Sequence, residues 1–202
     1  MDFAELCREL DGRLDLLLSP ERAAHSRRVA ELTASICERE HLDPWKGRAA
    51  GLAHDLCKEM TKKEQRGLAS RLAGLSSVST LLVQVSTLMA DKIVHGPAAA
   101  ALIAIDYGVD DRELLEAIAL HTVGKPGMRG LSIALYCADK LEPGRERLDE
   151  GFRERCLRMP LEGMLLSVVE GVIEWMREQG KAVAPETLIL YSTLDRKAGK
   201  KI

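Results

Sequence analysis

The chain has 202 residues, of which 46% are hydrophobic and 30% are charged. This length suits one well-buried domain and is short for two. The 29 basic and 31 acidic residues give a formal net charge of -2, so the composition offers no general attraction to nucleic acid or anionic lipid. No apolar run reaches the roughly 20 residues of a membrane-spanning helix. We therefore expect one soluble domain with no nucleic-acid or membrane partner.

All five cysteines stand apart from one another in the chain and follow no secretory signal. This usage is typical of a reducing compartment, and we expect the protein in the cytoplasm. Free cysteines are commonly buried and apolar in character, so none is assigned a chemical role. They are Cys7, Cys37, Cys57, Cys137 and Cys156.

Apolar residues recur at helical spacing from the start of the chain, whereas sustained alternation of β-branched and aromatic residues is hard to find. This pattern predicts an all-α fold. Leu10, Leu14 and Leu17 indicate a first helix within residues 1–19, which we expect to pack on the main domain.

Two cap-and-proline signals mark the helices that carry the first candidate functional residues. Ser19-Pro20 predicts the start of a second helix, and Asp43-Pro44 predicts the start of a third. His25 lies on the inward stripe of the second helix, together with Val29, Leu32 and Ile36. His54 and Asp55 lie near the end of the third, whose predicted buried face comprises Trp45, Ala49, Leu52 and Leu56.

Short helices and turns are predicted to alternate in the middle of the chain. Thr61 and Glu64 have capping-box spacing, which predicts a fourth helix. Residues 74–80 indicate a loop, and residues 81–90 a weakly marked helix. His95-Gly96-Pro97 is predicted to form a turn before an alanine-rich helix that stops at Tyr107-Gly108. Residues 110–113 then cap a helix whose inward face ends at His121.

The last part of the chain is predicted to be helical as well. Three glycines and a proline indicate a loop over 122–130, and the helix that follows ends near Asp139. Further helices are expected over 161–178 and, as a short element, after Pro185. Residues 196–202 form a short basic tail, which we interpret as a solvated end.

Four of the five histidines stand near predicted helix ends or turns, and we consider two aspartates with them. Taken alone, each histidine is more commonly a hydrogen-bonded or surface residue than a metal ligand. A bundle that turned all six side chains inward without a partner would bury several polar groups at a substantial free-energy cost. Metal ions would satisfy the set His25, His54, Asp55, His95, His121 and Asp139. His41 has no partner motif and is assigned no role.

The order of these residues resembles a known family. His25, the pair His54-Asp55 and the distant Asp139 resemble the HD-domain metal-dependent phosphohydrolases. The segments 95–97, 121–128 and 138–145 are similar, more narrowly, to the YqeK family. The resemblance covers approximately residues 20–195 and implies an all-α HD-domain helical bundle there. It also implies iron or a similar metal and the symmetrical hydrolysis of diadenosine tetraphosphate to two ADP.

The resemblance assigns roles residue by residue. It implies that the metal ligands are His25, His54, Asp55 and Asp139. It implies substrate contacts at His25, Lys58, His95, His121, Thr122, Asp139 and Arg145. His95 and His121 could instead complete a second metal site. Lys140 stands where the family would be expected to have an apolar or aromatic residue, which leaves the packing of a nucleotide there open.

The residue types suit this chemistry. Mixed imidazole and carboxylate ligands favour iron, manganese or zinc without choosing among them; the resemblance favours one or two iron ions. Phosphoryl transfer spreads negative charge over oxygens, so we expect Lys58, Arg145 and a protonated His95 or His121 to act catalytically. The alternatives are a cation at a helix C-terminus for Lys58 and a solvated surface residue for Arg145.

Other interpretations remain open at this level. Arg27 and Arg28 are expected to be charges on a helix surface. The chain could be an HD phosphohydrolase for a nucleoside triphosphate, a nucleotide monophosphate or a guanosine alarmone. It could also be a non-catalytic nucleotide-sensing HD module, or a purely structural helical bundle. The expected partner is a dinucleoside polyphosphate or ADP, and the chain could also form a homodimer.

Overall fold

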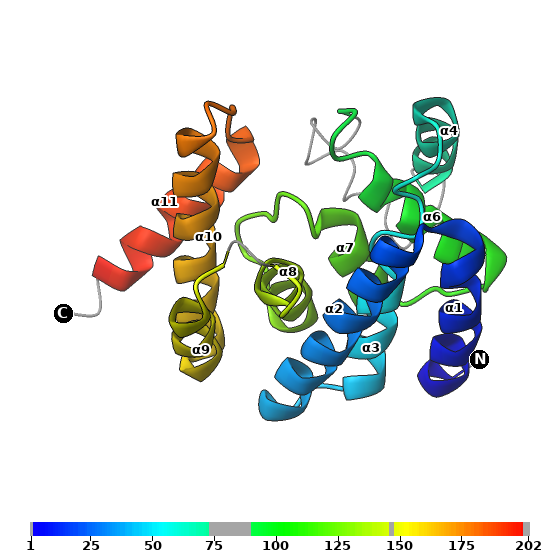
Figure 1. Ribbon diagram of the computed structural model, residues 1–202, viewed down its shortest axis with the longest axis horizontal. Helices are drawn as coiled ribbons and strands as arrows, with labels where there is room; N and C mark the ends of the chain where they lie inside the picture. The colour runs from blue at the N-terminus through cyan, green and yellow to red at the C-terminus, as the bar shows by residue number, and fades with distance from the viewer. Residues whose placement is uncertain (1, 73–89, 146–147, 200–202) are drawn as a thin grey trace.

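Every regular element in the part of the chain that the structure describes is an α-helix. The computed structural model describes residues 2–72, 90–145 and 148–199 (Figure 1). The helices are α1 (Phe3–Leu17), α2 (Pro20–Arg39), α3 (Pro44–Ala53), α4 (Lys62–Leu72), α6 (His95–Asp106), α7 (Arg112–Leu120), α8 (Gly130–Leu141), α9 (Glu150–Arg158), α10 (Leu161–Glu178) and α11 (Pro185–Gly199). The predicted all-α fold is therefore confirmed.

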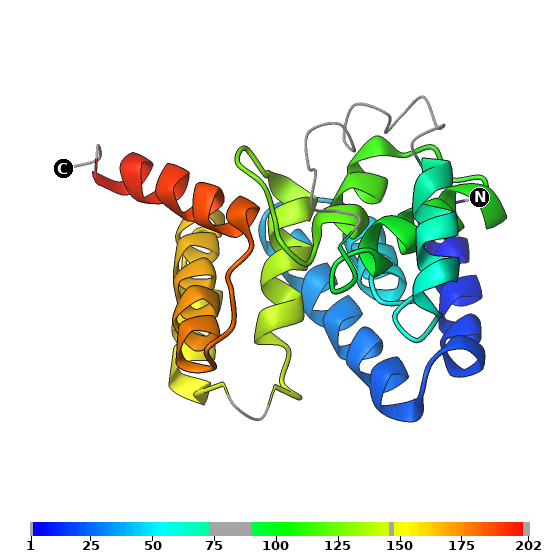
Figure 2. The ribbon, with the colours of Figure 1, turned by 90° about the horizontal axis from the view of Figure 1, so that it is seen from above.

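Helix α8 lies at the centre of the bundle. It packs against α2, α3 and α7 on one side and against α10 on another. Helices α9, α10 and α11 lie beyond it, on the side away from α1 (Figures 1 and 2). Residues 131–139 of α8 are all buried, which is the pattern of a helix enclosed on every side. A functional side chain near the end of α8 is therefore held on a rigid support.

Two glycines allow the close helix packing that positions the candidate residues. A side chain at Gly51 would collide with the backbone of Ala30, so its absence lets α3 lie directly against α2. A Cβ at Gly96 would lie 2.9 Å from the carbonyl oxygen of Ala119, so α6 approaches the end of α7 closely. These contacts bring the segments around residues 25, 54, 95 and 121 together.

Local signals explain most helix starts. Asp43 accepts hydrogen bonds from the backbone of Trp45 and Lys46, and Asp111 accepts one from Leu114. Thr61 and Glu64 form the reciprocal bonds of a capping box at the start of α4. Helix α1 packs against α3, and its residues Leu6, Leu10 and Leu14 join the core.

The structure corrects several sequence-based expectations. His95-Gly96-Pro97 is the first turn of α6 rather than a separate turn, since proline is accommodated in the first turn of a helix. Trp45 is 50% exposed instead of buried, because it lies in the first turn of α3 with Arg48 over its ring. Helix α9 was not predicted; only Cys156 of it is buried, so it carries little apolar periodicity.

Other expectations fall at the edges of the described residues. The predicted loop over 74–80 and nearly all of the helix over 81–90 lie outside them, as do the last three residues of the basic tail. Helix α11 continues to Gly199, so the last helix is longer than expected. Among the described residues, no helix has both the length and the apolar character needed to cross a bilayer.

Candidate metal centre

Six predicted site residues converge from five segments of the bundle. His25 comes from α2, His95 from the first turn of α6 and Asp139 from α8. His54 and His121 are the C-cap residues of α3 and α7, and Asp55 follows His54 directly. All six side chains are buried. The fold therefore gathers the full imidazole and carboxylate set at one place.

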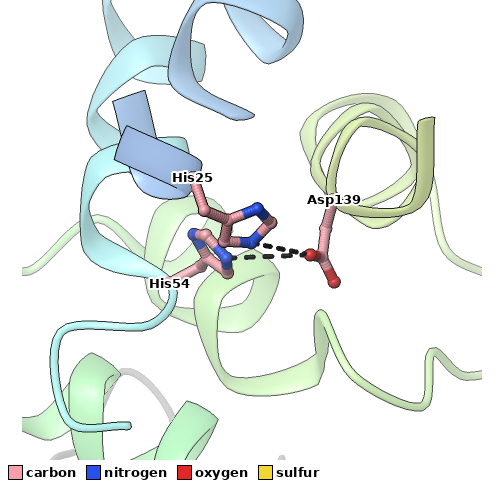
Figure 3. A group of neighbouring side chains, drawn as sticks. All are labelled: His25, His54 and Asp139. Atoms are coloured by element: carbon pink, nitrogen blue, oxygen red, sulfur yellow. Dashed lines mark ion pairs between the residues drawn. The ribbon is translucent and has the colours of Figure 1, made fainter. Parts of the chain in front are cut away.

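His25, His54 and Asp139 form the first candidate ligand group, and they point toward one another in Figure 3. The Nε2 atom of His25 lies 3.2 Å from Asp139 Oδ1, and that of His54 lies 3.9 Å from the same oxygen. Bonds from a transition metal to nitrogen or oxygen are about 2.0–2.2 Å long, so ligand atoms on one ion stand about 3–4 Å apart. The spacing fits a shared cation.

The backbone fixes the orientation of two imidazoles. His54 Nδ1 lies 2.7 Å from the carbonyl oxygen of Gly51, and His121 Nδ1 lies 2.8 Å from that of Ile118. Since a carbonyl can only accept, each Nδ1 carries the proton and each Nε2 keeps its lone pair. The Nε2 atom of His54 is buried with no hydrogen-bond partner among the described residues. A cation would satisfy this lone pair.

Glu142 orients the third imidazole. Its Oε1 atom lies 3.1 Å from His25 Nδ1, and its Oε2 atom accepts from Arg28 Nε at 2.5 Å and from Gly144 N at 2.6 Å. Histidines that bind metals commonly give their other ring nitrogen to a carboxylate in this way. Burial alone would lower the pKa of His25, but hydrogen bonds with Asp139 and Glu142 outweigh burial and raise it.

His54, Asp55 and His121 form a second candidate ligand group. Asp55 Oδ1 lies 3.2 Å from His95 Nε2 and 3.6 Å from His121 Nε2. The Nε2 atoms of His95 and His121 are 3.2 Å apart. Burial opposes the charge on Asp55, but the neighbouring imidazoles and Lys58 hold its pKa well below the ordinary value. Asp55 is therefore an ionised carboxylate, as ligation requires.

The protonation states differ from the sequence-based expectation. Burial lowers the pKa of His121 to about 3, and it lowers the pKa of His95 below its ordinary value. Both rings are therefore neutral near neutral pH, whereas one of them was expected to be a protonated acid. Burial explains the difference, since removing an imidazolium from water costs more free energy than its interaction with Asp55 provides. Neutral rings suit metal ligation and hydrogen bonding to an oxygen.

The predicted phosphate contacts also lie at the centre. Lys58 Nζ is 2.9 Å from His95 Nε2 and 3.4 Å from Asp55 Oδ1. Arg145 Nη2 is 2.6 Å from Asp139 Oδ1, and Thr122 Oγ1 is 3.2 Å from His121 Nε2.

Lys140 occupies a place that sequence reasoning left open. Its Nζ atom donates to the carbonyl oxygen of His121 at 2.6 Å and to Asp139 Oδ2 at 2.9 Å. It also lies 4.1 Å from the centre of the Tyr136 ring. The Lys140 ammonium thus links α8 to the end of α7, and it pairs with Asp139 Oδ2.

A polar pocket of about 590 Å³ opens over the centre, which is in the size range of small-molecule sites. It is lined by His25, Asp55, His121 and Asp139, and by four cations, Arg22, Arg28, Lys58 and Arg145. Neither Arg22 nor Glu142 was predicted to lie at the site, and Arg28 was expected to be a charge on a helix surface. The i, i+3 spacing of residues 22, 25 and 28 on α2 was the available signal. Arg27 does lie on an outer surface, where it pairs with Asp11 and Asp15.

Comparisons with known proteins agree with this geometry. Proteins named "Bis(5'-nucleosyl)-tetraphosphatase, symmetrical" from Halalkalibacterium halodurans and Bacillus subtilis are 27% and 26% identical to this chain over 177 residues. Each match covers 88% of this chain, with 90% and 91% of the respective relative. A protein of the same name from Staphylococcus aureus is 33% identical over 63% of this chain and 62% of its own. The resemblance to the YqeK family is thereby confirmed.

A solved structure shares the fold. It is described as a predicted HD superfamily hydrolase involved in NAD metabolism from Clostridium acetobutylicum. It is 24% identical, covers 94% of this chain and 97% of its own, and superposes with a TM-score of 0.76. Residues 22–144, which hold all six candidate ligands, match the family described as HD domain. This chain therefore belongs to the HD domain family.

Proposed function

We propose that this protein hydrolyses diadenosine tetraphosphate symmetrically, breaking the central phosphate anhydride to release two ADP. One observation carries the proposal: a buried histidine–aspartate centre lies under a polar pocket that four Lys and Arg side chains help to line, in a chain that matches proteins named symmetrical tetraphosphatases over 88% of its length. All five cysteines are free and buried, in keeping with the reducing cytoplasm in which we place this reaction.

We propose that His25, His54, Asp55 and Asp139 hold the metal, and that it is one or two iron ions, with manganese or zinc as alternatives. The orphaned Nε2 of His54 and the mixed nitrogen and oxygen donors support a transition metal. A bound ion lowers the pKa of a coordinated water and draws charge from phosphate oxygens. Both candidate groups include His54, so they are compatible with one shared ion or with a pair.

The remaining residues bind and orient the polyphosphate in this proposal. Lys58 and Arg145 each contact a carboxylate of the centre, so both are close enough to meet a phosphate lying over it. Their charges offset the negative charge that develops on the phosphate oxygens. The Thr122 hydroxyl and the neutral ring of His121 line the pocket, and the neutral ring of His95 contacts both. In this proposal they fix the substrate by hydrogen bonds or by further ligation.

Product analysis tests the proposal. The purified protein, loaded with iron under reducing conditions, is incubated with diadenosine tetraphosphate, and the nucleotides are separated by chromatography. We expect ADP as the only product, and no turnover after chelation or in Asp55→Asn. Asp195 is exposed, so Asp195→Asn is a matched control that should retain activity. Formation of AMP with ATP would contradict the symmetrical reaction.

Two alternatives are decided in the same assay. Faster turnover of a nucleoside triphosphate, a nucleotide monophosphate or a guanosine alarmone would favour another HD phosphohydrolase. A nucleotide-sensing module would bind the dinucleotide and leave it intact in the presence of every metal. The charge-neutralising residues around the centre favour hydrolysis, because they face the place where charge builds up during phosphoryl transfer.

A further inference from the structure

Gln65 of α4 is a fully buried polar side chain that the proposed reaction does not use. Its Nε2 atom donates to the carbonyl oxygens of Cys57 at 2.7 Å, Met60 at 3.1 Å and Lys58 at 3.3 Å. Its Oε1 atom accepts from Lys62 Nζ at 2.8 Å. Both ends of the amide therefore have partners, which offsets the cost of burying it.

The turn over 57–60, which connects α3 to α4, has few backbone hydrogen bonds of its own. The Lys58 N–H donates to the carbonyl oxygen of Asp55 at 2.8 Å, and the Met60 N–H donates to that of Cys57 at 3.3 Å. In the described part of the chain, no backbone N–H donates to the carbonyl oxygens of Lys58 and Met60. Carbonyls that are removed from water need a donor. The amide of Gln65 supplies the hydrogen bonds that the turn lacks.

This turn carries Lys58 to the centre. Lys58 Nζ lies 2.9 Å from His95 Nε2 and 3.4 Å from Asp55 Oδ1, and the Lys58 side chain lines the pocket. A lysine side chain is long and flexible, so the position of its ammonium depends on how firmly its backbone is held. Gln65 contacts the carbonyl of Lys58 itself and does not line the pocket. It therefore reaches Lys58 through the backbone, without access to a bound substrate.

We propose that Gln65 is a positioning residue, whose amide holds the 57–60 turn so that the ammonium of Lys58 stays beside Asp55. This inference rests on the proposed function, in which Lys58 offsets the charge that develops on phosphate oxygens. Because Gln65 acts only through Lys58, its loss should lower kcat rather than raise KM. The same loss should have little effect on kcat once the Lys58 ammonium has been removed.

A double-mutant cycle with Gln65→Met and Lys58→Met tests the inference in the iron-loaded protein. Methionine fills a similar volume without an N–H donor. We expect Gln65→Met to lower kcat roughly 10-fold, with KM and metal content close to wild type, because a small misplacement of a catalytic group is costly. Lys58→Met should lower kcat roughly 10- to 100-fold. In the Lys58→Met background, Gln65→Met should change kcat by no more than roughly two-fold.

Two further variants separate the amide donor from the shape of the side chain. Gln65→Glu keeps the shape, but an ionised carboxylate can only accept, so it should lower kcat at least as much as Gln65→Met. Gln65→Asn keeps the amide on a side chain that is one methylene shorter, and it replaces Gln65→Met in the cycle should that variant fail to fold. The matched control is Gln179→Met at the C-cap of α10, where the glutamine is exposed. It should leave kcat unchanged.

Hydrogen exchange measures the turn independently of turnover. Mass spectrometry of the metal-loaded protein should show faster amide exchange in peptides covering residues 55–61 of Gln65→Met than in wild type, because the turn opens more often. Peptides from α8 should exchange at the wild-type rate. The same increase over 55–61 should appear when Gln65→Met is added to Lys58→Met, although kcat no longer responds.

The outcomes separate this inference from the proposed function. Wild-type protein that releases no ADP from diadenosine tetraphosphate contradicts the proposed function, and the inference falls with it. An active wild type with an unchanged kcat in Gln65→Met contradicts the inference alone. Equal losses of kcat from Gln65→Met with and without the Lys58 ammonium would also overturn it, since Gln65 would then serve the fold in general. A loss of bound metal in Gln65→Met would have the same meaning.

Discussion

The Oε1 atom of Glu142 lies 3.1 Å from Nδ1 of His25, although 117 positions separate the two residues in the chain. Glu142 is 1% exposed, so this contact is shielded from water. It sets the direction in which His25 presents its other nitrogen to Asp139. The carboxylate thus belongs to the machinery of the centre without being one of the proposed ligands.

Removal of the Glu142 carboxylate should weaken metal binding. Loss of such an outer contact typically lowers metal affinity roughly 10- to 100-fold. We expect Glu142→Ala to show this loss in a competition titration with a fluorescent chelator, and Glu142→Gln, which keeps an acceptor oxygen, to show a smaller one. Glu150→Gln is the control, because the Glu150 side chain is 81% exposed. Equal affinities in all the variants would refute the orienting role.

Glu142 should also contribute to acid stability. Burial opposes its charge, but hydrogen bonds with His25 and Arg28 outweigh burial and lower its pKa from 4.5 to about 2. A lowered pKa in the folded state stabilises the fold above the unfolded-state pKa, and that contribution is lost as the pH falls from 4.5 to about 2. The contribution is on the order of 3 kcal/mol. Urea unfolding of the metal-free protein across this range should show a shallower pH dependence in Glu142→Gln than in wild type.

Substitution of Gly51 should disturb the fold and the centre together. A methyl group there would meet the backbone of Ala30 and Val29, which cannot move aside as a flexible side chain could. We expect Gly51→Ala to lower the free energy of unfolding by roughly 1–3 kcal/mol, the usual cost of overpacking. Gly67→Ala is the matched control in α4, because no atom lies within 4 Å of its new Cβ. It should be neutral or stabilising by up to about 1 kcal/mol; an equal loss in both variants would contradict this packing account.

Metal binding should stabilise the folded protein. Ligation satisfies the buried His54 Nε2 and compensates the charges of Asp55 and Asp139. The unfolded chain does not hold these ligands together, so the ion binds the folded state preferentially. An ion present at 100 times its dissociation constant adds about 2.7 kcal/mol. Thermal melts under anaerobic conditions should therefore shift upward with added ferrous or manganous ion in the wild type. A shift of the same size in Asp55→Asn would place the binding elsewhere.

Much of this architecture could be predicted because its signals are local. Cap residues such as Asp43, Asp111 and Thr61 predict where helices begin to within a few positions, and their predicted roles match the structure. The candidate ligands could be proposed as a set because several inward-facing histidines and aspartates would each need a hydrogen-bond partner or a bound cation. Helix α9 was not predicted because it is short and only Cys156 of it is buried, which leaves a weak apolar pattern.

The outer contacts could not be predicted in the same way. Arg28 and Glu142 are ordinary charged residues until α2 and the end of α8 meet, and no spacing rule connects positions so far apart. The neutral state of His121 depends on how deeply its side chain is buried. Helical periodicity indicates only that the side chain points inward. Lys140 donates to a backbone carbonyl that becomes available only where α7 ends beside α8.

The most direct test of the central claim is product analysis by mass spectrometry in oxygen-18 water, with metal-loaded protein and diadenosine tetraphosphate. Symmetrical attack of water on the central anhydride predicts ADP as the only nucleotide product. One of each pair of ADP molecules should carry a single heavy oxygen on its terminal phosphate. AMP together with ATP, or ADP formation that persists in Asp55→Asn and after chelation, would contradict a symmetrical hydrolase built on this metal centre.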